Sequence, residues 1–195
     1  MDHPSATEAE LVAACQRGRQ WAQHALYHRY AKAMLNTAHR IVNQPEDAQD
    51  VLQEAFLKVF QQIHRYRGEA TIGAWIKRIV VNTALNHIRK KGLPIVGGLE
   101  VVEAEVAAPT EAADDLELDA RLAREALASL PTGYRTVLTL YLVEGYDHQE
   151  IAEILGVSIS TSLSQYSRGK KKLKEALLKM KEDGPDRKVL RYAQG

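Results

Sequence analysis

The chain has 195 residues, of which 45% are hydrophobic and 26% charged, and this composition fits a soluble globular protein of one or two small domains. No apolar run approaches the roughly 18 residues of a membrane-spanning helix. The N-terminus lacks the basic start and apolar core of a signal peptide, and the single Cys15 excludes an internal disulfide. We therefore expect a cytoplasmic protein without membrane insertion.

The charge is strongly segregated, although the formal net charge is only +1. Residues 65–91 carry seven Lys and Arg side chains against one acid, and residues 168–181 carry seven against one. Between them, residues 100–119 contain eight acids and no Lys or Arg. Basic segments on either side of an acidic spacer indicate two units that face nucleic acid, joined by a tether.

The first half of the chain predicts four helices. Thr7 and Glu10 form a capping-box pattern at the first of them, and Pro45 suits the first turn of the third. The expected helices cover about residues 7–18, 19–41, 45–62 and 74–91, with a loop at 68–73. We assign residues 1–91 to the first domain.

Residues 92–113 are predicted to be a linker, because Pro94 and the Gly97-Gly98 pair break helical structure. Helical spacing resumes near Asp114, so we expect a second domain over 114–181 and a flexible tail over 182–195. No alternating strand pattern occurs. The sequence thus predicts an all-α fold of two small helical domains joined by a flexible acidic linker.

The second domain carries a helix-turn-helix pattern. A helix is expected over 134–143, Asp147 can cap the next one with Glu150, Gly156 supplies a left-handed stop, and Ser158 caps a long basic helix. A helical hairpin with no DNA-binding role can use the same glycine stop. The two caps and the basic continuation favour DNA binding.

An acidic face is predicted on the third helix. Asp47, Asp50 and Glu54 are spaced by three and four residues, with Gln53 beside them, while Val51 and its apolar neighbours supply the buried side. A solvated acidic surface and a protein-binding surface have the same spacing. Spacing alone does not decide between them.

Aromatic and basic residues follow this face. Tyr66 and Trp75 are interleaved with Arg and Lys, and aromatic rings can stack on exposed bases for about 1–3 kcal/mol each. Asn can pair with an adenine edge, which favours a DNA role for Asn82. For Trp75, packing in the core is an equally good interpretation. One face of the fourth helix is expected to carry Trp75, Arg78, Asn82, Asn86 and Arg89.

Other chemistry finds little support. His24 and His28 have metal-capable spacing on a helix, but no third ligand is evident. The Gly97-Gly98 pair lacks the Lys-Ser/Thr of a phosphate-binding loop, and no nucleophile–base pair can be assembled. We expect no metal, no cofactor and no enzymatic activity.

Three segments of the first half resemble region two of the extracytoplasmic-function sigma factors, and the helix-turn-helix with the preceding Leu130-Pro131 resembles region four of the same family. The segments are residues 47–56, 66–68 and 75–86. The resemblance implies an alternative sigma factor that directs core RNA polymerase to promoters, melts the minus-ten element and recognises the minus-thirty-five element. It also implies binding to the β′ clamp helices and the β flap of the polymerase, and an anti-sigma partner.

The resemblance assigns three sets of residues. Those expected to bind core polymerase are Asp47, Asp50, Gln53 and Glu54. Those expected at minus-ten DNA are Tyr66, Arg67, Gly68, Thr71, Trp75, Arg78, Asn82 and Asn86, where Asn82 and the 67–74 loop would capture a flipped base. Those expected at minus-thirty-five DNA are Ser160, Thr161, Ser164, Gln165, Ser167, Arg168 and Lys171.

Leu163 departs from the family pattern, in which Arg or Lys is common near the start of the recognition helix. It could touch a thymine methyl group, or it could pack inward and change which residues face the groove. Two other functions compete with the sigma-factor hypothesis. A stand-alone regulator would bind its operator without polymerase, and an anti-sigma or scaffold protein would give no promoter-dependent transcription.

Overall fold

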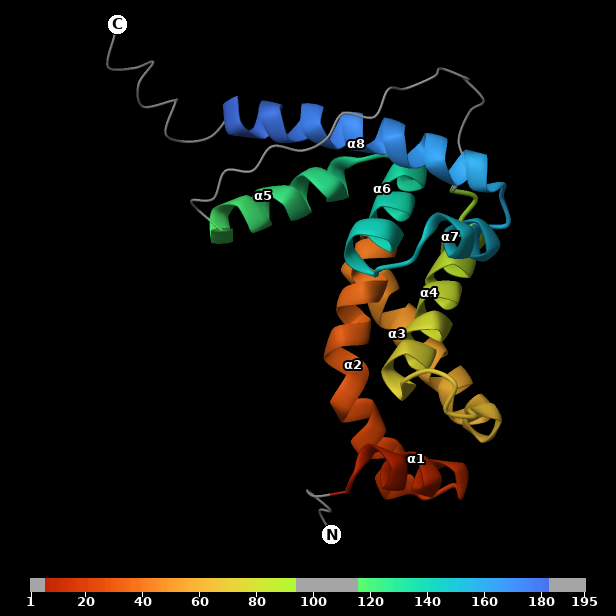
Figure 1. Cartoon of the computed structure of the whole chain (residues 1–195). Coiled ribbons are helices and arrows are strands. Elements are labelled where there is room, and N and C mark those ends of the chain that lie inside the picture. The colour runs from red at the N-terminus through yellow and green to blue at the C-terminus, as the bar shows by residue number, and fades with distance from the viewer. Residues whose placement is uncertain (1–5, 94–115, 183–195) are drawn as a thin grey trace, which may run out of the picture. The chain divides into compact units, whose positions relative to one another are not determined.

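The computed structural model describes residues 6–93 and 116–182, with side chains from residue 120 onward in the second range. Every regular element in these ranges is a helix, which confirms the predicted all-α, two-domain fold (Figure 1). The chain divides into two compact units after Leu93. Most of the predicted acidic linker and tail lies outside the described residues. None of the described helices combines the length and apolarity needed to cross a bilayer.

Three long helices build the first unit around a shared apolar core. In chain order its elements are α1 (Glu8–Gln16), α2 (Gln20–Val42), α3 (Pro45–Gln62), a short 3-10 turn η1 (Ile63–Arg65) and α4 (Ile72–Lys90). Helices α2, α3 and α4 pack against one another, whereas α1 packs on α2 and η1. The core includes the fully buried side chains of Leu26, Ile41, Val51, Val59, Ile76 and Leu85.

Local signals set the helix ends in this unit. The predicted capping box is present, since the Thr7 hydroxyl accepts from the Glu10 amide and the Glu10 carboxylate accepts from the Thr7 amide. Pro45 occupies the first turn of α3 as predicted. Helix α4 begins at Ile72, two residues earlier than expected, because the Thr71 hydroxyl caps it by accepting from the Ala74 amide at 3.2 Å.

The second unit contains α5 (Leu116–Ser129), α6 (Thr132–Leu138), a π-helical turn η2 (Thr139–Val143), α7 (His148–Leu155) and α8 (Ile159–Glu182). The helix expected over 134–143 therefore has two parts, since the Glu144 amide donates to the Thr139 carbonyl five residues earlier. Gly169 brings α8 close to α6, because a Cβ there would lie 3.1 Å from Leu138.

The helix-turn-helix signals are confirmed. Asp147 and Glu150 form a capping box at the start of α7, and Gly156 ends that helix with φ of +72°. The Ser158 hydroxyl then accepts from the Thr161 amide at 3.1 Å and caps α8. Short side-chain caps and one left-handed glycine thus define the turn between the two helices.

Candidate protein and nucleic-acid interfaces

The acidic face of α3 is partly open to a partner. Asp50 and Gln53 are exposed, and Glu54 keeps 43% of its side chain accessible. Leu57, one turn further along, is 63% exposed and places an apolar side chain beside these polar groups. An exposed acid pair next to an exposed leucine is a surface that suits a basic protein partner.

Asp47 differs from the other acids because it is bound within its own unit. Lys91 Nζ lies 2.6 Å from each carboxylate oxygen, and His87 Nε2 lies 3.2 Å from Oδ1. The hydrogen bond from Lys91 lowers the pKa of Asp47, whose side chain is only 15% exposed. Asp47 therefore ties the start of α3 to the end of α4, and it offers less to a partner than Asp50 does.

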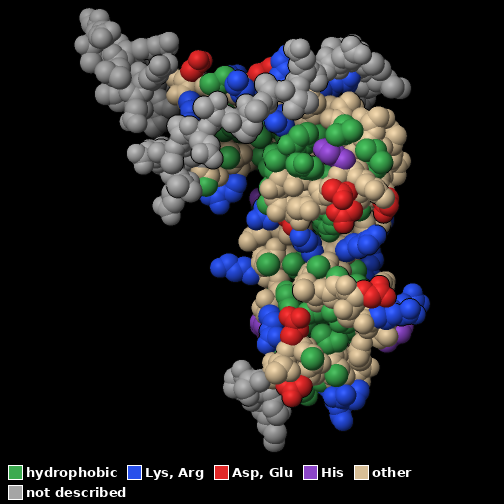
Figure 2. Space-filling view, in the orientation of Figure 1, with side chains coloured by type: hydrophobic (Ala, Val, Ile, Leu, Met, Phe, Trp, Pro, Cys, Tyr) green, Lys and Arg blue, Asp and Glu red, His purple; other side chains and the backbone are tan. Residues whose placement is uncertain are grey.

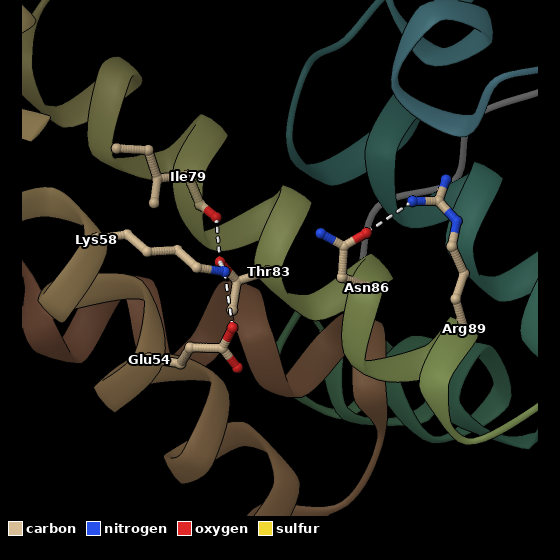
Figure 3. Close-up of polar contacts among 6 residues, drawn as sticks. All are labelled: Glu54, Lys58, Ile79, Thr83, Asn86 and Arg89. Carbon is tan, nitrogen blue, oxygen red and sulfur yellow. Dashed lines mark hydrogen bonds and ion pairs between the residues drawn. The ribbon is translucent and has the colours of Figure 1, made fainter.

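A second tie joins α3 to α4 (Figure 3). Lys58 Nζ donates to Glu54 Oε1 at 2.7 Å and to Thr83 Oγ1 at 3.3 Å, while the Thr83 hydroxyl donates to the Ile79 carbonyl. The hydrogen bond from Lys58 lowers the pKa of Glu54. The acidic face is thus connected to α4 next to Asn82. The sequence contains a signal for this ion pair, because Lys58 follows Glu54 by four residues and such pairs face each other on a helix.

The segment between η1 and α4 is organised around Tyr66. Its hydroxyl donates to the Ala70 carbonyl at 2.6 Å, and its ring centre lies 5.6 Å from that of Trp75. Trp75 is half-buried, so part of its ring packs on Tyr66 and part remains accessible. Arg67 and Gly68 are exposed, with Gly68 at φ of +79°. The Thr71 hydroxyl, predicted to face DNA, serves as the α4 cap.

The outer face of α4 carries the predicted polar residues. Arg78, Asn82, Asn86 and Arg89 are all exposed. Arg89 Nη1 donates to Asn86 Oδ1 at 3.0 Å, which orients the amide of Asn86 (Figure 3). On the face that Figure 2 draws, the Lys and Arg side chains lie in several separate groups and do not form one continuous patch.

The exposed face at the start of α8 is more apolar than expected. Ile159 and Leu163 are each 49% exposed, so Leu163 points outward and does not pack inward. Gln165 is a correction to the predicted DNA-facing set, because only 6% of it is accessible. Ser162 is fully buried, where its hydroxyl lies 2.9 Å from His148 Nδ1.

The remaining predicted residues of α8 differ in the hydrogen bonds that their side chains already make and in their exposure. The Ser158 hydroxyl lies 2.8 Å from those of both Ser160 and Thr161, and the Ser164 hydroxyl donates to the Thr161 carbonyl. These contacts use one of the three hydrogen-bonding positions of each of the Ser160, Thr161 and Ser164 hydroxyls. The predicted residues beyond them are half-exposed Ser167 and Arg168 and exposed Lys171.

The two histidines at metal-capable spacing lie on the surface of the first unit. His24 and His28 are both exposed on α2. Among the residues that the structure describes, no three His, Cys, Asp or Glu side chains form a group able to hold a metal ion. The surfaces described above consist of charged, amide and apolar groups.

Comparisons with known proteins agree with this arrangement. Sigma-70 region 2 matches residues 26–93, and Sigma-70 region 4 matches residues 120–173. The RNA polymerase sigma-H factor of Pseudomonas aeruginosa is 30% identical over 87% of this chain and 93% of its own length. The ECF RNA polymerase sigma-E factor of Escherichia coli K12 is 30% identical over 84% of this chain and 91% of its own length.

Two solved structures share the fold. CnrH, determined in complex with the cytosolic domain of CnrY, has a TM-score of 0.52 at 23% identity and covers 87% of this chain and 96% of its own. The sigma factor RpoE, determined in complex with the anti-sigma factor NepR from Bartonella quintana, has a TM-score of 0.53 at 21% identity and covers 79% and 95%. By its two matched regions and its full-length relatives, the chain belongs to the extracytoplasmic-function sigma factors of the sigma-70 family.

Proposed function

We propose that this sigma factor, which directs RNA polymerase to promoters, divides its tasks among three helices. The exposed acidic face of α3 docks on the clamp helices of the polymerase β′ subunit. The outer face of α4, with the segment before it, binds the melted minus-ten element. Helix α8 holds duplex DNA at the minus-thirty-five element, and the second unit also meets the β flap.

One observation carries the proposal for the first unit. Asp50 and Gln53 are exposed on α3 while Arg78 and Asn82 are exposed on α4, so one small unit presents an acidic and a basic surface on different helices. A basic protein and a nucleic acid can then bind at the same time, each to the surface of opposite charge. A stand-alone regulator would leave the α3 surface without a purpose.

At the minus-ten element, Asn82 is proposed to hydrogen-bond a base that has left the stack. Extruding a base costs a few kcal/mol, which contacts in a prepared site must offset. Asn82 supplies a donor and an acceptor on one side chain, and half-buried Trp75, about two turns earlier on the same helix, keeps part of its side chain accessible. Exposed Arg67 and Arg78 supply charge for the phosphates.

At the minus-thirty-five element, the start of α8 is proposed to lie in the major groove. Helix-turn-helix proteins contact base edges with the N-terminal residues of the second helix. Here those residues combine small hydroxyl side chains with two apolar ones, and basic residues follow further along. The proposed contacts are Ser160, Thr161, Ser164, Ser167, Arg168 and Lys171, with Leu163 added.

We also propose that an anti-sigma protein holds this chain inactive in the cytoplasm. Support comes from the structurally similar RpoE, which was determined with the anti-sigma factor NepR. No catalytic role of its own is proposed.

Replacing Asn82 with Ala tests the minus-ten proposal. The variant is expected to form open complexes about tenfold less well, because one or two base contacts are worth about 1–3 kcal/mol. Its affinity for core polymerase should be unchanged. Asn36→Ala, at an exposed position of α2, is the matched control. Equal open-complex yield from Asn82→Ala and the parent protein would exclude base capture by this side chain.

A duplex-binding measurement separates the sigma factor from the stand-alone regulator. The sigma factor should bind its promoter tightly only together with core polymerase. Tight, sequence-specific binding to duplex DNA by the protein alone would favour the regulator instead.

A further inference from the structure

Helix α1 precedes the range that matches Sigma-70 region 2, yet it is hydrogen-bonded to residues directly before the loop proposed to capture a base. Gln16, the last residue of α1, donates from Nε2 to the carbonyl of Ile63 at 3.1 Å and to that of Tyr66 at 3.2 Å. A primary amide nitrogen has two hydrogens, and here both are directed at backbone oxygens nearly 50 residues away in sequence. This side chain fixes the point from which the 67–71 loop departs.

Tyr66 extends that fixation across the loop. Its carbonyl is held by Gln16, its hydroxyl donates to the Ala70 carbonyl at 2.6 Å, and its ring packs against Trp75. One residue therefore closes both ends of the 67–70 segment. The orientation of Tyr66 in turn sets where Arg67 and the accessible part of Trp75 lie.

Helix α1 also supports the far end of the loop. The Tyr30 hydroxyl, on α2, donates to Glu8 Oε2 of α1 at 2.7 Å. The Tyr30 ring packs so closely on Gly73 that a Cβ at that position would lie only 3.0 Å from the ring. Gly73 belongs to the first turn of α4, directly after the loop. Through Tyr30, the same helix that holds the beginning of the loop thus braces the turn at its end.

The 67–71 loop depends on these hydrogen bonds for its position, because few side chains pack behind it. An open hollow of about 350 Å³ lies between α1 and the loop, with Gln16 at its edge. Its lining includes Glu8, Val12, Gln16, Tyr66, Arg67 and Gly68. A loop backed by a hollow moves unless polar contacts restrain it.

We infer that Gln16 is a positioning residue for the minus-ten site: by holding Ile63 and Tyr66, it keeps the 67–71 loop in the form that receives the flipped base. This inference rests on the proposed function of that loop. A loop that is already ordered loses little further entropy when the base binds, so more of the contact energy remains to offset unstacking. Gln16 acts through the loop and touches no base.

The test compares Gln16→Glu with Gln20→Glu. Both substitutions keep the side-chain size and add one negative charge at an exposed position, but only the first removes amide hydrogens from Ile63 and Tyr66. Open-complex formation is measured with core polymerase on a promoter selected by in vitro transcription. Abasic sites are first placed one at a time in the minus-ten element, and the position at which base loss weakens opening by the parent protein is taken as the captured position. The same promoter with an abasic site at that position is the second substrate.

We expect Gln16→Glu to open the intact promoter roughly tenfold less well than Gln20→Glu, and both proteins to open the abasic promoter equally. Gln16→Ala, which adds no charge, and Tyr66→Phe, which removes the hydroxyl tie to Ala70, should show the same pattern. Core-polymerase affinity and the thermal midpoint followed by tryptophan fluorescence should match the parent. These two readouts separate a defect in the loop from a defect in folding or docking.

Equal losses on intact and abasic promoters would overturn the inference, because Gln16 would then act outside the base-binding site. No loss on either promoter, in both Gln16 variants, would overturn it as well. If the inference alone is wrong, Asn82→Ala still impairs opening in a base-dependent way. If the proposed base capture is wrong, Asn82→Ala opens the intact promoter as well as the parent protein does. The parent protein then also opens every abasic promoter as well as the intact one.

Discussion

At the scale of single residues, burial decides which side chains of the recognition helix can reach DNA. Leu163 and Ile159 are half exposed and one helical turn apart, whereas Gln165 is buried at 6% exposure. A groove-facing surface made of two aliphatic side chains and several hydroxyls would recognise methyl groups as well as hydrogen-bonding edges. Specificity at the minus-thirty-five element is then expected to include thymine methyl contacts.

Replacing thymine by uracil in the minus-thirty-five element removes only methyl groups and tests this contact. The substitution is expected to weaken promoter binding by the parent holoenzyme about fourfold, since burying one methyl group contributes about 0.8 kcal/mol. Leu163→Ala should be insensitive to the change. Competition binding of the holoenzyme to the two promoters measures both effects.

Leu178→Ala is the control, because Leu178 is 53% exposed further along the same helix. An equal thymine preference in Leu163→Ala and Leu178→Ala would contradict a methyl contact by Leu163.

At the scale of helices, the charged residues of α3 stabilise the unit as well as forming its surface. Asp47 is bound by Lys91 at the end of α4, and Glu54 is linked through Lys58 to Thr83 in the middle of α4. Asp50, on the same face, remains exposed. Helices α3 and α4 are therefore held to each other at two points.

Asp47→Asn is expected to lower the stability of the first unit by about 1 kcal/mol, which corresponds to a midpoint decrease of a few degrees. Pairing with Lys91 lowers the pKa of Asp47 in the folded state. The difference in unfolding free energy between variant and parent should reach its maximum above the unfolded-state pKa of about 3.9. It should disappear as the pH falls through the lower folded-state pKa of Asp47. Thermal unfolding followed by tryptophan fluorescence measures it, because Trp21 and Trp75 both lie in this unit.

Asp50→Asn provides the comparison, with little expected change in stability. The interpretation of Asp47 as a tie between α3 and α4 would be wrong if Asp47→Asn lost core binding while its unfolding midpoint stayed at the parent value.

The junction between α6 and the π-helical turn η2 gives a second prediction at this scale. Thr136 in α6 and Thr139 at the start of η2 are fully buried, and neither hydroxyl oxygen has a hydrogen-bond partner among the residues that the structure describes. Thr136→Val keeps the shape and removes an unpaired polar group, so the second unit should become more stable by about 1 kcal/mol. Circular dichroism records the unfolding of both units, and the transition that tryptophan fluorescence does not detect belongs to the second. A lower midpoint for that transition in Thr136→Val would show that the hydroxyl is satisfied.

Features encoded over a few residues could be predicted from the sequence. The Thr7 and Asp147 capping boxes, the Pro45 start and the Gly156 stop all depend on neighbouring residues, and each was predicted correctly. Features that depend on tertiary packing could not be predicted from the sequence. The inward side chain of Gln165 reflects how α8 packs, and the bonds from Gln16 join segments about 50 residues apart.

At the scale of the whole chain, charge segregation assigns different partners to different parts. The first unit presents an acidic surface on α3 and a polar, basic one on α4, and the second unit carries a basic continuation of its recognition helix. The partners would be the polymerase, the melted strand and the upstream duplex. Polymerase docking comes first in this account, because only the holoenzyme brings both DNA-binding surfaces to a promoter.

Equilibrium binding of the purified protein to core RNA polymerase therefore tests the account most directly. The charge-reversed variant Asp50→Lys/Glu54→Lys is compared with Glu125→Lys/Glu153→Lys, which makes the same change in net charge at exposed positions of the second unit. We predict that the first variant binds core polymerase at least about a hundredfold more weakly than the parent, since like charges across an interface cost several kcal/mol, and that the second keeps near-parent affinity. Parent-like affinity in Asp50→Lys/Glu54→Lys, with its fold intact, would contradict docking through α3.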